Sequence, residues 1–403
     1  MTTPPPARGH LPTLIACFLH FDLSFMLWVL LGALGVFVAE DLGLSAAEKG
    51  LVVALPLLTG SLLRIPVGFA SDRFGGKRVA LCLLALVGLA LVVAWRGASG
   101  VPSLVMAALL LGAGGASFAV ALPLASRWYP PERQGLVMGI AAAGNSGTVL
   151  TNLIAPALAT VIGWRGVFGA ALLPLPAVAV AFQVMARESP GRAPASISAT
   201  WRALRESDLW WFCMFYAVTF GGYVGLSTFL PLFLRDQFAV DALTAGRLTA
   251  VAALVGSFSR PVGGVMADRF GGVRVLTLAL GGIGIVYSFA ARLPGLGSMM
   301  VLTVLGMALF GMGNGAVFQL VPQRFRLHLG AATGVVGAVG GLGGFLLPAL
   351  LGILKQTTGS FGPAFALFGV AAFGAAAWLQ WLVSREERWR QWRRGTLDFA
   401  EEA

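Results

Sequence analysis

The sequence predicts an all-α membrane protein in which twelve transmembrane helices form two related bundles of six. Three observations predict this fold class. The 403-residue chain is 57% hydrophobic and only 11% charged, whereas soluble domains carry roughly a quarter charged residues. A stretch of the first half recurs in the second half, which indicates duplication. Basic residues concentrate on one side of the predicted spans, as the positive-inside rule requires.

The apolar runs have the length of about 20 residues that crosses a bilayer. We predict spans over residues 11–39, 49–71, 79–95, 101–126, 135–160, 165–186, 208–234, 243–267, 273–291, 297–321, 330–354 and 361–383. Residues 11–186 and 208–383 then form the two bundles, joined by a cytoplasmic linker over 187–207. Residues 1–10 and 384–403 are expected to be cytoplasmic tails.

The distribution of charge sets the expected topology. With the N-terminus inside, 19 of the 28 Lys and Arg residues lie on the cytoplasmic side and 7 on the opposite side. This places both termini in the cytoplasm and the chain in the cytoplasmic membrane. The net charge of +11 is therefore explained by topology, and no nucleic-acid partner is expected.

Residues that signal other classes of protein are missing from the sequence pattern. The three cysteines, Cys17, Cys82 and Cys213, stand in separate apolar runs and are interpreted as packing residues. We find no pairing of nucleophile and base, no clustered metal ligands and no phosphate-binding loop. We therefore expect no enzymatic activity, no metal and no cofactor, and a monomer in the lipid bilayer.

The repeated stretch is Ser61–Val79, which recurs 196 positions later as Ser257–Val275 with ten of nineteen residues identical. Both copies hold an arginine, Arg64 and Arg260, in an otherwise apolar or small run. A cation near the bilayer centre costs about 2.5–3.5 kcal/mol. Two such residues at equivalent positions favour one shared central site, and their mutual repulsion favours a small anion as its ligand.

Each copy continues into Asp-Arg-Phe-Gly-Gly, where the glycine pair should end the helix in a short cytoplasmic loop. The aspartates are placed to meet a neighbouring helix end or the loop arginines. We interpret these residues as a conformational latch: Asp72, Arg73, Asp268 and Arg269.

Two predicted spans are rich in glycine, although each glycine in a helix costs about 1 kcal/mol relative to alanine. The glycines at issue are Gly139, Gly144 and Gly147 in the fifth span and Gly334, Gly337, Gly340 and Gly341 in the eleventh. Close packing of small residues explains them, and a bare face would also let the helices slide. The fifth span has fewer glycines, so the two need not act alike. Its Asn145 faces either a partner helix or the central site.

The motif G-x-x-x-D-R-x-G-G-[KR] between the second and third spans, repeated between the eighth and ninth with Val273 in its last place, resembles the loop signature of the major facilitator superfamily. This resemblance implies a twelve-helix fold that works by alternating access. The paired arginines and paired glycine-rich helices resemble one branch, the nitrate/nitrite porter family, over Leu11 to Val383. The implied function is secondary active transport of nitrate and nitrite.

A planar guanidinium matches a flat oxyanion such as nitrate with two parallel hydrogen bonds. Tyr216 and Phe220 are four residues apart and share a helix face. The resemblance implies that both line the substrate site, whereas core packing would otherwise explain Phe220. Phe118 and Asn145 complete the expected set.

The driving force stays open between nitrate/nitrite exchange, which needs no protonatable group, and proton symport, which needs one. Asp22 and His20 in the first span are the candidates, and Asp22 is equally explained by local pairing near an interface. Asn314 and Gln319 in the tenth span are contact residues or site residues.

Two other functions are weighed against transport of nitrate. One is a facilitator for organic anions or drugs in the same superfamily, which should show a more varied polar lining. The other is a membrane sensor or an anion channel, which the short loops and the repeated latch motif disfavour.

Overall fold

The computed structural model describes residues 9–98, 100–129, 137–138, 140–188, 204–325 and 329–394. The first half contains α1 (Leu11–Trp28), α2 (Leu30–Ala33), α3 (Gly35–Leu42), α4 (Ala46–Phe74), α5 (Gly76–Gly97), α6 (Val101–Leu111), the 3₁₀ segment η1 (Gly112–Ser117), α7 (Phe118–Ser126), the 3₁₀ segment η2 (Ala143–Ser146), α9 (Gly147–Ala170) and α10 (Pro174–Met185). Most of the predicted linker and Gly139 lie outside the described residues.

In the second half, each predicted span is a single helix. These are α12 (Ser207–Phe238), α13 (Ala242–Phe270), α14 (Gly272–Ala290), α15 (Leu296–Arg324), α16 (Leu329–Thr358) and α17 (Gly362–Arg385), followed by the short α18 (Glu387–Arg394). The predicted C-terminal tail thus begins with a helix.

The fold class predicted from the sequence is confirmed: the described chain is helical, and its apolar helices have the length and composition of twelve membrane passes. Eleven stretches among the described residues meet these criteria, and one of them, Ile140–Met185, has 46 residues. At 1.5 Å per residue it extends about 70 Å, enough for two crossings of a 30 Å hydrocarbon core. Gly163 breaks it with a φ of 71°, so the stretch contains the fifth and sixth spans.

The first predicted span is not one straight helix. It is interrupted at Val29 and Leu34, which separate α1, α2 and α3. Gly32 and Gly35 bring this broken part against Thr228 and Leu232 of α12. The interrupted segment therefore lies against the second half.

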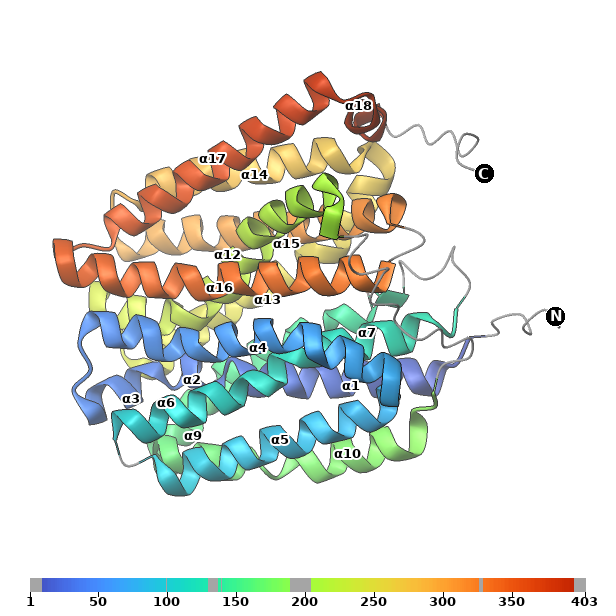
Figure 1. Ribbon diagram of the computed structural model, residues 1–403. Coiled ribbons are helices and arrows are strands. Elements are labelled where there is room, and N and C mark those ends of the chain that lie inside the picture. Colours follow the sequence, from blue (N-terminus) through green and yellow to red (C-terminus); the bar gives the residue numbers. More distant parts are fainter. Residues whose placement is uncertain are drawn as a thin grey trace.

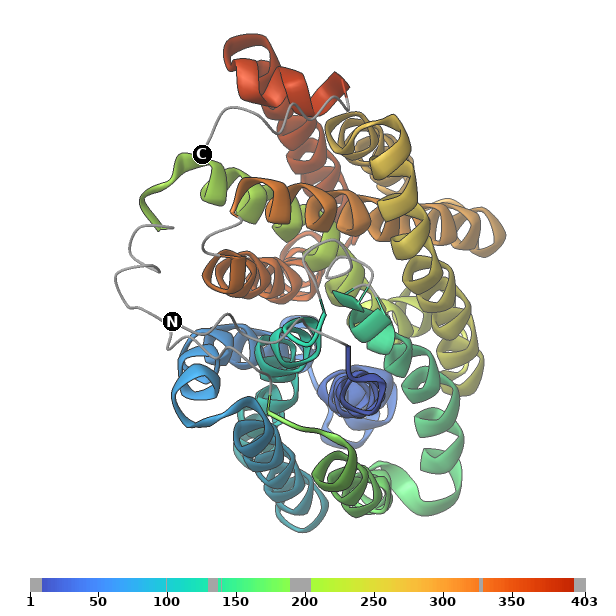
Figure 2. The same ribbon diagram turned by 90° about the vertical axis from the view of Figure 1, so that its right-hand side faces the viewer.

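Figure 1 shows the two halves side by side, the first in blue to green and the second in lime to red, and Figure 2 views them end-on. α4 packs against α16 and α9 against α13 at their interface. The start of α1 and α18 lie at one end of the molecule (Figure 1). We call it the inner end and the opposite end the outer end.

The repeat is visible in the geometry of α4 and α13. Both have 29 residues, begin after a capping side chain and end at a glycine. Gly75 and Gly271, which are 196 positions apart, have φ of 105° and 92°. Only glycine adopts such angles without strain, so these glycines set the two inner loops.

Candidate functional site

Arg64 lies at the interface of the halves and is 1% exposed. Leu62 and Ile65 on the same helix are exposed apolar residues, so Arg64 points away from lipid and into the protein. Its Nε donates to the Gly115 carbonyl at 3.0 Å, and its Nη1 donates to the carbonyl of Gly337 on α16. Arg64 therefore bonds to both halves of the molecule.

Arg260 occupies the equivalent place on α13 and is 9% exposed. It makes no ion pair with the described residues, and its buried Nη1 has no hydrogen-bond partner there. Arg64 Nη2 is likewise buried without a partner in the described part of the chain. Arg64 lies 5.0 Å from the ring centre of Phe118 and Arg260 lies 5.3 Å from that of Phe318, and these two ring centres are 6.0 Å apart, so the like charges share one region. The arrangement leaves N–H donors free in a region of concentrated positive charge.

Aromatic rings surround the two guanidiniums. The Cζ of Arg64 lies 5.0 Å from the ring centre of Phe118 and 5.4 Å from that of Phe220. Phe220 stacks on Tyr216 with ring centres 4.9 Å apart. The Tyr216 hydroxyl is buried near both arginines and has no hydrogen-bond partner of good geometry among the described residues. The structure thus brings together the arginines and all three aromatic residues that the sequence suggested.

Two further aromatic residues belong to this cluster and were not predicted. Trp28 lies over Arg64 at 5.4 Å and donates from Nε1 to the Pro56 carbonyl at 2.6 Å. Phe318 lies over Arg260 at 5.3 Å and contacts the ring of Tyr216 at 5.0 Å. Each arginine therefore has a phenylalanine from the fourth span of its own half, Phe118 in the first half and Phe318 in the second.

The 3₁₀ segment η1 explains why a comparison of the two half-sequences does not identify Phe318 as the counterpart of Phe118. Ungapped alignment of Gly112–Pro123 with Gly311–Pro322 matches Phe118 to Val317, one residue short of Phe318. Six residues at about 120° each in η1 turn the chain through nearly the same angle as seven residues at about 100° in α15. The sequence signal that could have identified Phe318 is a phenylalanine shortly before a proline in both spans, Phe118 before Pro123 and Phe318 before Pro322.

Asn145 lies in η2 and is 3% exposed, with its Oδ1 unpartnered in the described region. The neighbouring Ser146 donates to Asp22 Oδ1 at 2.7 Å, so η2 is joined to α1. His20 points elsewhere: its Nε2 lies 3.0 Å from the Ala80 carbonyl and its ring packs on Phe182. Of the two candidates for proton coupling, Asp22 alone touches the segment that carries Asn145.

The two amides of α15 take no part in the hydrogen bonds of the arginines. Asn314 is buried, and its Oδ1 has no partner among the described residues. Gln319 Oε1 faces Gly272 at the start of α14. Neither amide oxygen has a hydrogen-bond partner among the described residues.

The glycines of α16 lie against the cluster itself. A Cβ on Gly340 would collide with the ring of Tyr216, and one on Gly341 would collide with Ser61 Oγ. A Cβ on Gly337 would come within 3.0 Å of Phe118, whereas Gly334 has open space. Glycine therefore lets α16 approach the aromatic walls and α4 of the other half.

The glycines of the fifth span serve a different contact. A Cβ on Gly144 would lie 2.9 Å from the Asp22 nitrogen, and one on Gly147 would meet the Asp22 carbonyl oxygen. Both contacts are with the α1 backbone in the same half. The two glycine-rich helices thus have different neighbours.

The inner loops also differ between the halves. Asp72 forms an ion pair with Arg127, which follows α7, at 2.8 Å. The matching Asp268 has no ion pair among the described residues, and Arg73 and Arg269 lie over the adjacent Phe74 and Phe270. In the first half, the aspartate of the predicted latch therefore ties α4 to α7.

At the outer end, ion pairs cross between the halves. Lys49 on α4 binds Asp236 on α12 at 2.8 Å, and Arg235 binds Glu40 on α3 at 2.8 Å. The ion pairs described at the inner end all lie within one half. The halves are thus held together electrostatically at the outer end.

A family model described as Major Facilitator Superfamily matches residues 16–327. The chain belongs to the major facilitator superfamily. It is 35% identical over 366 residues to the nitrite extrusion protein of Bacillus subtilis, covering 89% of this chain and 91% of that protein. It is 33% identical to a probable nitrate/nitrite antiporter, NarK1, of Thermus thermophilus, covering 85% and 84%.

Solved structures agree on the fold of this superfamily member. The xylose transporter XylE of E. coli, in a partially occluded inward-open conformation, superposes with a TM-score of 0.75 at 14% identity, covering 93% of this chain and 97% of that one. The resemblance to the nitrate/nitrite porters predicted from sequence is confirmed by the relatives.

Proposed function

We propose that this membrane transporter carries nitrate and nitrite, exchanging one for the other at a site formed by Arg64 and Arg260. One observation carries the proposal: two buried guanidiniums from equivalent helices of the two halves have free N–H groups and no carboxylate partner among the described residues. An anion between them relieves their repulsion. The names of the relatives in Bacillus and Thermus support the same substrates.

The shape of the site favours a small, flat oxyanion. The planar guanidinium donates two parallel hydrogen bonds, which nitrate and nitrite can accept side by side. Tyr216 offers a buried hydroxyl, and the rings of Phe118, Phe220 and Phe318 enclose the space around the charges. A larger organic anion would have to displace these rings.

Alternating access follows from the two-sided position of the site. Arg64 already bonds to Gly337 across the interface, and an anion would add a second bridge to Arg260. Binding therefore favours a state in which the halves are close together. Release of the ion pairs that join the halves at the outer end would open the site toward that end. By the positive-inside rule, the inner end and both termini are cytoplasmic.

The test is nitrate exchange and binding by the purified protein, wild type against Arg260→Lys. Lysine keeps the charge but loses the planar pair of donors, so we expect roughly 100-fold weaker nitrate binding. Bulky organic carboxylates, which would have to displace the rings, should compete poorly with labelled nitrate. Unchanged affinity in Arg260→Lys, or strong competition by bulky organic carboxylates, would reject this small oxyanion site.

Exchange is proposed over proton symport because no acid pairs with either arginine among the described residues, and an exchanger needs no group that changes charge. Asp22 is the test case because it binds Ser146 next to Asn145. Proteoliposomes loaded with nitrite should take up nitrate equally with and without a pH gradient, and Asp22→Asn should retain this exchange. Uptake into anion-free vesicles that needs a pH gradient and Asp22 would establish symport instead.

A further inference from the structure

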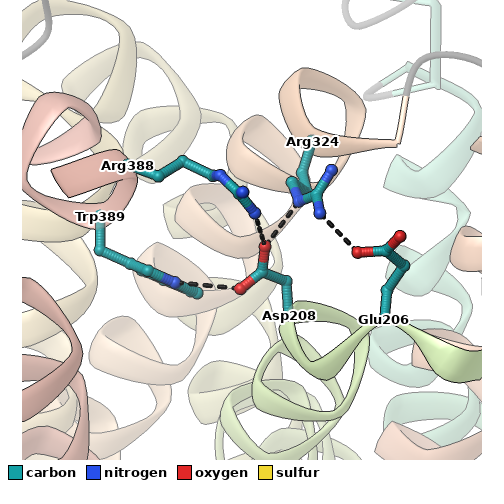
Figure 3. Close-up of polar contacts among 5 residues, drawn as sticks. All are labelled: Glu206, Asp208, Arg324, Arg388 and Trp389. Atoms are coloured by element: carbon teal, nitrogen blue, oxygen red, sulfur yellow. Dashed lines mark hydrogen bonds and ion pairs between the residues drawn. The ribbon is translucent and has the colours of Figure 1, made fainter. Parts of the chain in front are cut away.

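The second half carries a buried ion-pair cluster at its inner end. Asp208 is 2% exposed. Its carboxylate accepts hydrogen bonds from Arg324 Nε at 2.5 Å, from Arg388 Nη1 at 2.7 Å and from Trp389 Nε1 at 3.1 Å (Figure 3). Arg324 Nη2 also donates to Glu206 at 2.6 Å. Two carboxylates thus balance two guanidiniums in a partly dehydrated setting, where such bonds are strong.

The cluster joins three helices that are far apart in sequence. Asp208 lies in the first turn of α12, Arg324 is the last residue of α15, and Arg388 and Trp389 belong to α18. Trp389 is fully buried, with its ring centre 5.2 Å from that of Phe212 on α12. The C-terminal helix is therefore packed into the bundle through this cluster.

Two of these helices, α12 and α15, carry aromatic residues that lie beside Arg64 and Arg260. Tyr216 lies eight residues beyond Asp208, about 12 Å along α12, and Phe318 lies six residues before Arg324, about 9 Å along α15. Their rings are in contact at 5.0 Å, and Phe318 covers Arg260. A change in the angle between α12 and α15 at the inner end would separate the rings.

We propose that Asp208 is a positioning residue for the anion site. Its ion pair with Arg324 fixes α12 against α15, and its bonds from Arg388 and Trp389 add α18 to this contact. We call these four residues the inner clamp. This inference rests on the proposed function. Asp208 touches no substrate, and it acts through Tyr216 and Phe318.

A comparison of equivalent positions in the two halves indicates that the inner clamp is specific to the second half. In the first half, Arg127, which precedes Arg324 by 197 positions, pairs with Asp72 on α4. Pro12 stands 196 positions before Asp208, so the first half has no acid there. Asp268, the repeat of Asp72, has no ion pair in the described chain. The arginine after the fourth span of each half is thus tied to different helices.

The test measures nitrate exchange by proteoliposomes containing the full chain with Asp208→Asn, which keeps the size of the side chain and removes its charge. We expect the KM for nitrate to rise about tenfold while the maximal rate stays within about twofold. Asp208→Glu should recover most of the affinity. Glu387→Gln is the matched control, since Glu387 pairs only with Arg390 on the exposed side of α18 among the described residues.

A double-mutant cycle separates positioning from general stabilisation. Because Asp208 acts through the Tyr216–Phe318 contact, Asp208→Asn should raise KM much less in a Phe318→Ala background than in the wild type. Should Asp208→Asn fail to fold, Arg388→Ala provides the same test with an expected rise of about threefold.

Independent, multiplying effects of Asp208→Asn and Phe318→Ala would overturn the proposal, as would equal KM values for Asp208→Asn and Glu387→Gln. Wild-type protein that exchanges no nitrate would instead reject the proposed function. The two failures are therefore distinguishable in one set of vesicles.

Discussion

Arg64 and Arg260 occupy equivalent places in the two halves, yet they have different surroundings. Arg64 donates to carbonyls of both halves and is almost fully buried. Arg260 lies against the face of Phe318, and its Nη1 has no hydrogen-bond partner among the described residues. The first arginine thus donates to both halves, whereas the second leaves its Nη1 without a partner in the described region. Equivalent positions in the repeat therefore do not give the two charges equivalent surroundings.

The largest expected effect comes from replacing either arginine with lysine. Arg260→Lys should reduce nitrate affinity alone, whereas Arg64→Lys should reduce both affinity and turnover, since it also loses the bond to Gly337. We expect roughly 100-fold loss of kcat/KM in Arg64→Lys. Equilibrium binding and exchange rates, measured on the same preparations, check the contrast. Identical profiles for the two variants would remove the distinction between the arginines.

The glycine-rich helices offer the next comparison. Gly340→Ala should push Tyr216 away from the arginines and lower nitrate affinity by about tenfold, because a buried clash of this kind costs about 1–3 kcal/mol. Gly334→Ala on the same helix meets open space and is the control. Gly147→Ala should displace α1 and reduce protein stability more than affinity. Binding and thermal unfolding of the three variants distinguish these outcomes.

Two of the outer ion pairs, Lys49–Asp236 and Arg235–Glu40, cross between the halves, and the described inner pairs do not. Lys49→Ala should favour opening of the outer end by up to about fivefold, the range of a single partly exposed pair. Spin-label distances between the outer ends of α3 and α13 report this opening. Exchanging the charges, with Lys49→Asp and Asp236→Lys together, should restore the wild-type distances. No change in Lys49→Ala would mean that this pair does not hold the outer end closed.

The smallest effect concerns the helix starts. Ser45 and Glu48 form a reciprocal cap on α4, whereas Asp241 alone caps α13 by accepting from the Thr244 nitrogen at 2.9 Å. Ser45→Ala should lower the free energy of unfolding by about 0.5–1 kcal/mol, measurable in detergent.

The hydrogen bonds from Thr244 hold the pKa of Asp241 below its ordinary value of 3.8. Its contribution to stability is therefore complete at neutral pH and is lost as the pH falls through this range. Asp241→Asn, which keeps the cap, should weaken that acid dependence. An unaltered pH profile would contradict this assignment.

The sequence predicted most of the fold because the repeat and the lengths of the apolar runs are local properties. Repeat position placed Arg64 and Arg260 at one depth, and helical spacing placed Tyr216 and Phe220 on one face, whereas only the family resemblance put these rings beside the arginines. Phe318 was missed because η1 changes the rotation of one helix and not of its counterpart.

The Asp208 cluster was missed for another reason. Its members come from the start of α12, the end of α15 and α18, so only tertiary packing brings them together. Sequence symmetry pointed to Asp268 instead. The ion pairs that join helices within each half are thus less alike in the two halves than the aromatic residues that lie against Arg64 and Arg260.

The 3₁₀ segment between α6 and α7 has a consequence for how such duplicated proteins diverge. Side chains one position apart in an α-helix point about 100° away from each other. The tighter winding of η1 makes up most of this angle, and Phe118 still reaches its arginine. The two halves can therefore carry their rings at different positions of the aligned stretch while one ring lies over each charge.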